Sequence, residues 1–338
     1  MPMKAGDEDP ADLKVTTVSE KDFRRFGTDA EWFRAQLASC DVKLVTGSQM
    51  DLALKAMTQI STSFGTAARL PPTVVEELTR IVRDQGVGDS MLRRIRDGIG
   101  AANLVRAVRK ALEVDPRIFD GKWDLFRGPD VVLARYERQT AERNLTWELY
   151  VAALCLLAAT SVSIAGTENP DIRCWIRNVC WGVECKVFDS QSPDAHMRSI
   201  KSAARQLDSS DVDRGFIAVN LTSVIDHARF LQSLRAFGTP EFDGDAILVE
   251  LRRQAQTIVR PFTETVFENW ARKYRKTRAI FFQAQAIALT ETRLSLTTYR
   301  RWVALHRPQP TDLVWPVQWP EAPDQAMENR FAKAVESF

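Results

Sequence analysis

Apolar residues recur every three to four positions through the first third of the chain, a spacing that places them on one side of a helix. It predicts helices over residues 19–37, 51–60, 71–85 and 90–114. Ser19 stands where an N-cap residue is expected. Residues 42–46 are expected to form a short strand or an extended link. Residues 1–18 are rich in Gly, Asp, Glu and Pro without any period, and are predicted to be a flexible tail.

Glycine and proline interrupt this pattern between residues 119 and 130, and a mixed pattern follows. A helix, three strands, a helix and a strand are expected in turn at residues 131–159, 161–165, 171–176, 181–188, 193–207 and 215–221. Later helices are expected at residues 223–237, 243–259 and 261–274. A strand pair (278–288 and 293–299), an extended strap (308–323) and a short helix complete the pattern.

This order predicts an α/β fold in which helices flank a mixed central sheet, with an all-helical domain at the N-terminus. The expected parts are a flexible tail (1–18), a helical domain (19–125), an α/β domain (126–310) and a C-terminal strap with a short helix (311–338). The tract from Leu149 to Thr167 carries no charge and approaches the ~20 residues that span a bilayer. Its alternation from Ser161 onward predicts a buried helix and then a strand, so we expect no membrane partner.

Composition narrows the functional classes. The chain has a net charge of +2, so a surface for nucleic acid would have to be a local patch. Five cysteines without a CxxC pair and only three histidines argue against a zinc site. The polar N-terminus lacks a signal-peptide core, and we expect reduced thiols and a cytoplasmic location.

The expected hairpin between residues 171 and 188 carries the most informative chemistry. With Arg177-Asn178 as its turn, Asp171 faces Glu184, and such cross-strand partners have Cβ atoms roughly 5 Å apart. Alternation places Glu184 and Lys186 on the same face of their strand. Two carboxylates this close repel each other, which raises one pKa unless a divalent cation or Lys186 compensates.

These residues, Pro170-Asp171 followed by Glu184-Cys185-Lys186, resemble the motif of the PD-(D/E)xK phosphodiesterase superfamily, the restriction-endonuclease-like nucleases. The expected order of helix, three strands, helix and strand over residues 140–222 also resembles the core of that superfamily. The resemblance implies a restriction-endonuclease-like sheet and a Mg²⁺ ion, with Mn²⁺ as an alternative. The cation would be held by Asp171, Glu184 and the backbone carbonyl of Cys185, with Lys186 beside the attacking water.

The resemblance extends to the two helices of this core. Glu148 matches in position an acid that many members carry on the first core helix, where it joins the metal site. Lys201 and Gln206 resemble polar residues on the helix after the Glu-x-Lys strand, which assist the site or contact the nucleic-acid backbone. Three cations spaced along one face of that helix, Arg198, Lys201 and Arg205, add to this nucleic-acid-binding set. A solvated amphipathic helix explains the same residues equally well.

Two further basic clusters have ordinary explanations. The helix expected at 90–114 carries six arginines and lysines that are diluted by acids, which favours a solvated face over a phosphate contact. The densest cluster, Lys273, Arg275, Lys276 and Arg278, fits either a phosphate contact or a charged helix end.

The sequence thus predicts a Mg²⁺-dependent nuclease, with DNA favoured over RNA and endonuclease over exonuclease action. The alternatives are a catalytically silent nucleic-acid- or protein-binding module on the same fold, and a helical scaffold without nucleic acid. Cutting both strands of a duplex would favour a homodimer, and the helical domain would set the target or a protein partner.

Overall fold

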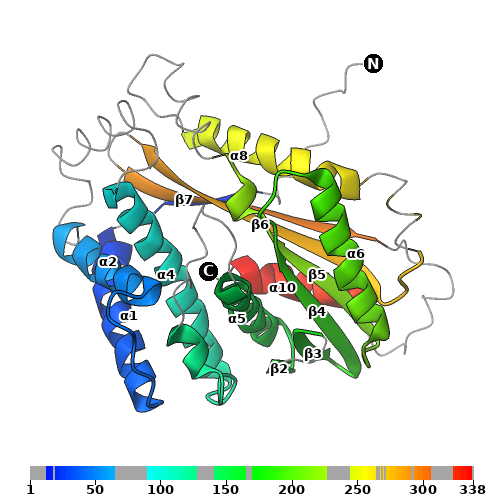
Figure 1. The fold of residues 1–338 in the computed structure, drawn as a ribbon, viewed down its shortest axis with the longest axis horizontal. Coiled ribbons are helices and arrows are strands. Elements are labelled where there is room, and N and C mark those ends of the chain that lie inside the picture. The colour runs from blue at the N-terminus through cyan, green and yellow to red at the C-terminus, as the bar shows by residue number, and fades with distance from the viewer. Residues whose placement is uncertain are drawn as a thin grey trace.

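A computed structural model describes the chain over residues 13–17, 20–64, 90–127, 141–164, 170–226, 244–263, 267, 269, 272–290, 293–305 and 323–336. Within these residues a seven-stranded sheet runs in the order β1-β7-β6-β5-β4-β3-β2 (Figure 1). The strands are β1 (Leu13–Thr17), β2 (Ser161–Ile164), β3 (Ile172–Ile176), β4 (Val179–Val187), β5 (Arg214–Asn220), β6 (Thr277–Thr290) and β7 (Arg293–Ala304). The described α-helices are α1 (Glu20–Ser39), α2 (Gln49–Phe64), α4 (Ser90–Val114), α5 (Ala141–Ala158), α6 (Pro193–Ser209), α8 (Gly244–Val259) and α10 (Pro323–Glu336).

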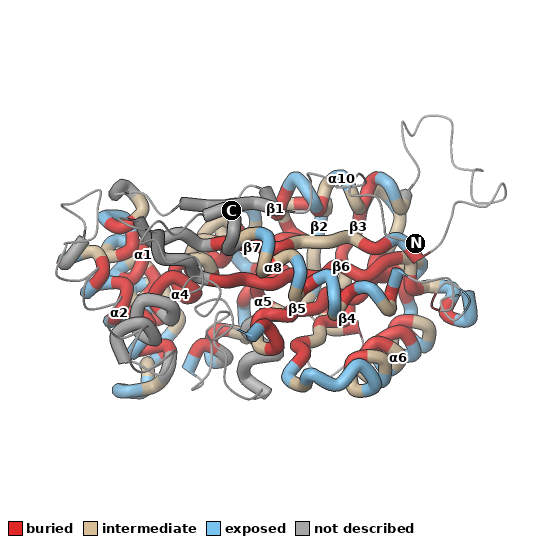
Figure 2. Tube along the Cα trace, turned by 90° about the horizontal axis from the view of Figure 1, so that it is seen from above, coloured by how far each residue is buried: buried red, intermediate tan, exposed pale blue. Residues whose placement is uncertain are grey.

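The sheet is mixed, as the sequence predicts. Strands β4, β5 and β6 are parallel, whereas β2, β3 and β4 pair antiparallel, as do β6, β7 and β1. The parallel strands lie buried between α10 and α6, on opposite sides of the sheet (Figure 2). Parallel strands covered on both faces are expected to be apolar throughout, which explains the buried run of β5.

Two hydrophobic clusters stabilise the two sides. One cluster joins α1, α2, α4, α5 and α10 to one face of the sheet. The other lies between the opposite face and the helices α6 and α8. The N-terminal helices pack on one another, and their core is continuous with that of the sheet through α5.

The hairpin of β3 and β4 has the predicted register. Ile172 pairs with Val183 and Ile176 with Val179, around a turn at Arg177 and Asn178. Arg177 has a φ of 57°, in the left-handed region that a tight hairpin turn requires. Continuing this register places Asp171, directly before β3, beside the middle of β4.

Helix α6 begins directly after β4 because its first turn is capped locally. Ser192 accepts a hydrogen bond from the Ala195 backbone N–H at 3.4 Å, and Pro193 occupies the first position, where no backbone donor is needed. The buried side of α6 then packs on β4 and β5.

Some expectations were wrong. Residues 13–17 belong to β1, which pairs with β7 and is not part of a flexible tail. Of the two alternatives for residues 42–46, the short strand is absent, and the segment is a link between α1 and α2. The helix expected at 261–274 is found only in part: it starts with a 3-10 turn, Arg260–Phe262, residues 267 and 269 are helical, and residues 272–276 are not. The helix expected from residue 223 begins instead as a 3-10 turn at Thr222–Val224.

Other expectations fall outside the described residues. These are the helix at 71–85, residues 131–140 of the helix at 131–159, most of the helix at 223–237, and the strap at 308–323. The closing helix is present as α10, and α4 has the predicted limits, residues 90 to 114.

Candidate functional site

Asp171 lies just outside β3, and its position is determined by the neighbouring strand. Its Oδ2 atom accepts a hydrogen bond from the backbone N–H of Cys185 at 2.7 Å. A hydrogen bond between a carboxylate and a backbone N–H is strong and directional. It therefore holds the Asp171 carboxylate beside the segment of β4 that carries Glu184 and Lys186.

Glu184 and Lys186 lie side by side on β4, as alternation predicts. The Lys186 ammonium donates a hydrogen bond to Glu184 Oε2 at 2.9 Å. The Glu184 side chain has no solvent exposure, whereas that of Lys186 is 21% exposed. The second carboxylate oxygen, Glu184 Oε1, is buried and has no hydrogen-bond partner within the described residues. Such an atom loses its hydration without compensation, which is costly unless a ligand supplies the missing interaction.

The side chains of β4 alternate between the two faces of the sheet as predicted, but the face that carries Glu184 is not exposed to solvent. Val183, Cys185 and Val187 belong to the cluster shared with α5. Glu184 pairs in register with Ile217, which belongs to the cluster on the α6 side. Helix α6 covers this side of β4, so that Glu184 is buried while Lys186 reaches the rim.

Glu148 approaches from α5. The preceding residue anchors this helix, because Trp147 Nε1 donates a hydrogen bond to the Ala218 carbonyl of β5 at 3.0 Å. Burial raises the pKa of Glu148 to about 7, and the negative charges of Asp171 and Glu184 add to the rise. Lys186 and Lys122 act in the opposite direction. The structure therefore brings Glu148 within electrostatic reach of the other three predicted residues.

The same causes act on the remaining acids. Burial raises the pKa of Glu184 to about 7, with Asp171 adding to the rise and Lys186 opposing it. Burial also raises the pKa of Asp171, against the opposing effects of the Cys185 N–H and of Lys186. For Lys186, burial lowers the pKa, but Glu184 and Asp171 raise it more, so the group remains protonated. Three carboxyl groups with raised pKa values thus lie within electrostatic reach of one ammonium.

A divalent cation would add positive charge beside these carboxyl groups. The donors are carboxylate oxygens, which Mg²⁺ prefers, and Glu184 Oε1 is a buried acceptor with no partner in the described part of the chain. Over the same residues, no three His, Cys, Asp or Glu side chains form a ready-made metal-binding group. The chemistry of the acids fits Mg²⁺, and the cation would bind through oxygens that Lys186 and the Cys185 N–H leave available. The role of the Cys185 carbonyl stays a prediction.

The residues predicted on α6 differ in their exposure. Arg198 and Arg205 are exposed, and Lys201 and Gln206 are half-buried. Arg205 Nε donates a hydrogen bond to the Tyr274 hydroxyl at 3.4 Å. Within the described residues, neither Arg198, Lys201 nor Arg205 forms an ion pair with the acids of the site.

Lys122 is the residue near the site that the sequence pattern did not reveal. It lies half-buried in the turn that follows α4 and lowers the pKa of Glu148. No local motif marks it, because its proximity depends on how the N-terminal helices pack against α5.

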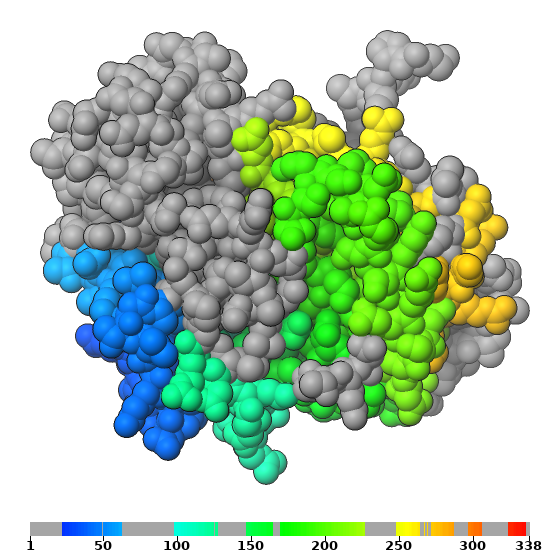
Figure 3. Space-filling model, viewed as in Figure 1, coloured from blue at the N-terminus to red at the C-terminus, as the bar shows by residue number. Residues whose placement is uncertain are grey.

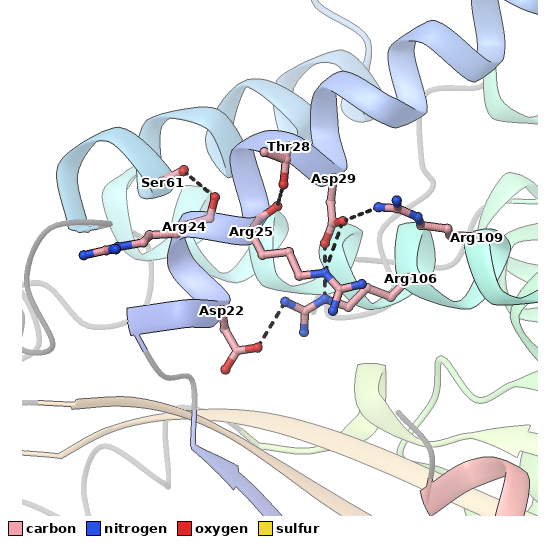
Figure 4. Close-up of polar contacts among 8 residues, drawn as sticks. All are labelled: Asp22, Arg24, Arg25, Thr28, Asp29, Ser61, Arg106 and Arg109. Carbon is pink, nitrogen blue, oxygen red and sulfur yellow. Dashed lines mark hydrogen bonds and ion pairs between the residues drawn. The ribbon is translucent and has the colours of Figure 1, made fainter.

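Two of the six basic residues of α4, Arg106 and Arg109, have a structural role, in place of the solvated face that the sequence favoured for this set. Arg106 and Arg109 donate hydrogen bonds to the fully buried carboxylate of Asp29 on α1, at 3.3 and 3.2 Å (Figure 4). Arg25 lies 3.5 Å from the same carboxylate, and Arg106 also reaches Asp22 at 3.3 Å. These arginines join two helices and are not arranged to receive phosphate.

Comparisons with protein-family models, with curated proteins and with solved structures gave no match to this chain. No helix in the described part of the chain is both long and apolar enough to cross a membrane. The functional interpretation therefore depends on the site itself.

Proposed function

We propose that the chain is a Mg²⁺-dependent nuclease that hydrolyses phosphodiester bonds, with DNA as the favoured substrate and internal cleavage favoured over cleavage from an end. The observation that carries the proposal is the convergence of Asp171, Glu184, Lys186 and Glu148 at β4, with one buried carboxylate oxygen without a partner in the described residues. The chain order α5-β2-β3-β4-α6-β5 is also the order that the restriction-endonuclease-like core implies.

Each residue has a separate task in this proposal. The Cys185 N–H orients the Asp171 carboxylate, and Lys186 orients that of Glu184, so that their remaining oxygens are available to a cation. Mg²⁺, when bound, lowers the pKa of water and neutralises phosphate charge. The partly exposed Lys186 ammonium can donate a hydrogen bond to a phosphate oxygen as negative charge develops. Glu148, within electrostatic reach of Asp171 and Glu184, would join them at the cation, as the resemblance implies.

Cleavage assays test the proposal directly. The full chain would be incubated with plasmid, linear duplex, single-stranded DNA and RNA, with Mg²⁺ and with a chelator. We expect Mg²⁺-dependent cleavage that Glu184→Gln and Lys186→Ala each reduce by about 100-fold or more. Asp189→Asn is the matched control, because Asp189 is an exposed acid just beyond β4. Retained cleavage in a folded Glu184→Gln protein would refute the assignment.

A second candidate is a catalytically silent binding module on the same fold. It is favoured by the ammonium of Lys186, which already neutralises one oxygen of Glu184. It predicts no cleavage of any of these substrates, together with nucleic-acid binding that survives the chelator.

A further inference from the structure

The loop at residues 272–276, before β6, is fixed to the end of α6. Tyr274 is buried in the cluster beneath α6 and α8, and its hydroxyl accepts the hydrogen bond from Arg205. The Lys276 backbone N–H donates to Asp208 Oδ1 at 3.0 Å, and the Lys276 ammonium donates to the Ser210 carbonyl at 2.5 Å. The Lys276 carbonyl in turn accepts the N–H of Gly215 on β5 at 2.7 Å.

This anchoring turns the other cations of the loop outward. Arg272, Lys273 and Arg275 flank the buried Tyr274 and are all exposed. They adjoin the outer face of α6, where Arg198, Lys201 and Arg205 follow one another along the helix. Figure 3 shows α6 in green on the face toward the viewer, with the gold residues that begin at 272 beside it. We name this surface the basic ledge: Arg198, Lys201, Arg205, Arg272, Lys273 and Arg275.

The ledge contrasts with those basic groups of the described residues that are paired with acids. No ledge residue forms an ion pair within the described residues. By contrast, Arg106 and Arg109 pair with Asp29, Arg214 with Asp324, and Arg253 with Glu250. Asp208, an acid at the loop junction, accepts a hydrogen bond from the Lys276 backbone N–H. Because no acidic partner among the described residues has to be displaced, the charge of these cations is available to an external anion.

The row of cations in the ledge also runs toward the proposed site. Gly182 of β4 lies in register with Gly215 and, through it, with Thr277, the residue after the loop. Lys186 lies four residues further along β4, roughly 13 Å at a rise of 3.3 Å per residue. Helix α6 runs back along this strand, so Arg198 is at the end nearer Lys186 and Arg205 at the end nearer the loop. A duplex advances by that distance in about four base pairs.

We propose that the basic ledge binds the sugar–phosphate backbone of a nucleic acid and leads it toward Lys186. The inference rests on the proposed function for its choice of partner, since an acidic protein or an anionic membrane would meet the same charge. A chain of phosphates spaced along one direction matches a row of cations on a helix and an adjoining loop.

Binding measurements at varied salt test the ledge separately from catalysis. The full chain carrying Glu184→Gln would be titrated, in chelator, against fluorescent duplexes of about 20 base pairs and single strands of about 20 nucleotides. A triple variant, Arg272→Gln, Lys273→Gln and Arg275→Gln, is compared with the control pair Arg117→Gln and Lys333→Gln. The control residues are exposed cations, and Lys333 lies on α10 across the sheet.

We expect the ledge variant to bind about 10-fold or more weakly near 150 mM salt, with the controls unchanged. The slope of log K against log salt should fall by about 0.9 for each phosphate that the variant no longer neutralises. Unchanged affinity and slope, no binding of nucleic acid at about 50 mM salt, or a preference for phosphatidylserine vesicles over DNA would overturn the proposal. Thermal unfolding verifies that the variants are folded.

The outcomes separate the two proposals. If the parent chain cleaves nucleic acid and the ledge variant binds it with unchanged affinity, the nuclease proposal is retained and the proposal for the ledge is refuted. If nucleic-acid binding depends on the ledge and no substrate is cleaved, the proposal for the ledge is retained and the silent binding module is favoured.

Discussion

The ammonium of Lys186 lies 2.9 Å from a carboxylate oxygen of Glu184 whose side chain has no solvent exposure. The pair is asymmetric, because the lysine reaches the rim while the glutamate is enclosed between β4 and α6. Removal of the cation would leave a buried negative charge without its partner, whereas removal of both charges would not.

This asymmetry predicts strong coupling between the two residues. At pH 8 in chelator, Lys186→Met should lower the free energy of unfolding by about 2–4 kcal/mol, because Glu184 must then be buried as a lone anion or take up a proton. The double variant with Glu184→Gln should recover at least half of that loss. Urea denaturation of the parent chain, the two single variants and the double variant gives the coupling energy between the two residues. Purely additive effects of the two substitutions would show that the pair does not stabilise the fold.

The raised pKa values predict how stability depends on pH in the absence of metal. Glu148 and Glu184 have pKa values of about 7, above the usual 4.5, so the folded chain binds their protons more tightly than the unfolded chain does. Their stabilising contribution is complete below about pH 4.5 and is lost as the pH rises through about 7. The raised pKa of Asp171 acts in the same direction.

Urea denaturation in chelator between pH 4.5 and 8 measures this effect. The difference in stability between the parent chain and the double variant Glu148→Gln and Glu184→Gln should shift steadily in favour of the variant as the pH rises. A difference that stays constant across this range would contradict the assigned environment of the two acids. The control Asp189→Asn should follow the parent chain, because Asp189 is exposed.

Gly182 sits where β4, α6 and the Pro170-Asp171 segment meet. A Cβ atom there would lie 3.0 Å from Pro170 Cγ and 3.0 Å from Leu207 Cδ2, both tighter than ordinary contacts. Gly182→Ala should therefore cost about 1–3 kcal/mol of stability and displace Asp171. We expect cleavage to fall by about 10-fold or more even where the variant is fully folded, because small displacements at a reacting centre are costly.

The neighbouring Gly215 provides the comparison for this substitution. A Cβ atom at Gly215 would lie 2.8 Å from the backbone carbonyl of Gly182, which has less freedom to move than a side chain. Gly215→Ala should accordingly destabilise the chain more than Gly182→Ala. Denaturation curves together with cleavage rates at a temperature below both transitions test this order. Full cleavage activity in Gly182→Ala would show that Pro170 does not transmit the displacement.

Local patterns were sufficient to predict the hairpin. Its register follows from the turn at Arg177 and Asn178 together with the alternation in β4, and both signals lie within a few residues of the contacts they determine. The same is true of α4, whose limits at residues 90 and 114 coincide with the helical period. Asp171 therefore lies beside β4, as the sequence predicts.

Contacts between distant parts of the chain account for what was missed. Strand β1 pairs with β7, whose partner residues lie 278 to 286 positions later, and a five-residue segment is too short to be predicted as a strand from its own sequence. The complete burial of Glu184 depends on α6 covering β4, which alternation alone does not reveal. The effect of Lys122 on Glu148 likewise requires the packing of the N-terminal helices against the sheet.

The last prediction concerns the ion pairs of the N-terminal helices. Asp29 is fully buried and accepts hydrogen bonds from Arg106 and Arg109, whereas the Asp22 side chain, which pairs with Arg106, is 33% exposed. Asp29→Asn should lower the free energy of unfolding by about 2–4 kcal/mol, because guanidinium groups held against a buried position lose their counter-charge. Asp22→Asn should cost less than about 1 kcal/mol, as is typical of exposed pairs.

Urea denaturation measures both losses, and cleavage assays add the functional comparison. Because these residues join α1 to α4 and do not reach β4, neither substitution should alter the cleavage rate of the folded chain. Equal costs for the two substitutions would mean that burial does not distinguish the two carboxylates. A large loss of cleavage in folded Asp29→Asn would instead connect the helical region directly to the site.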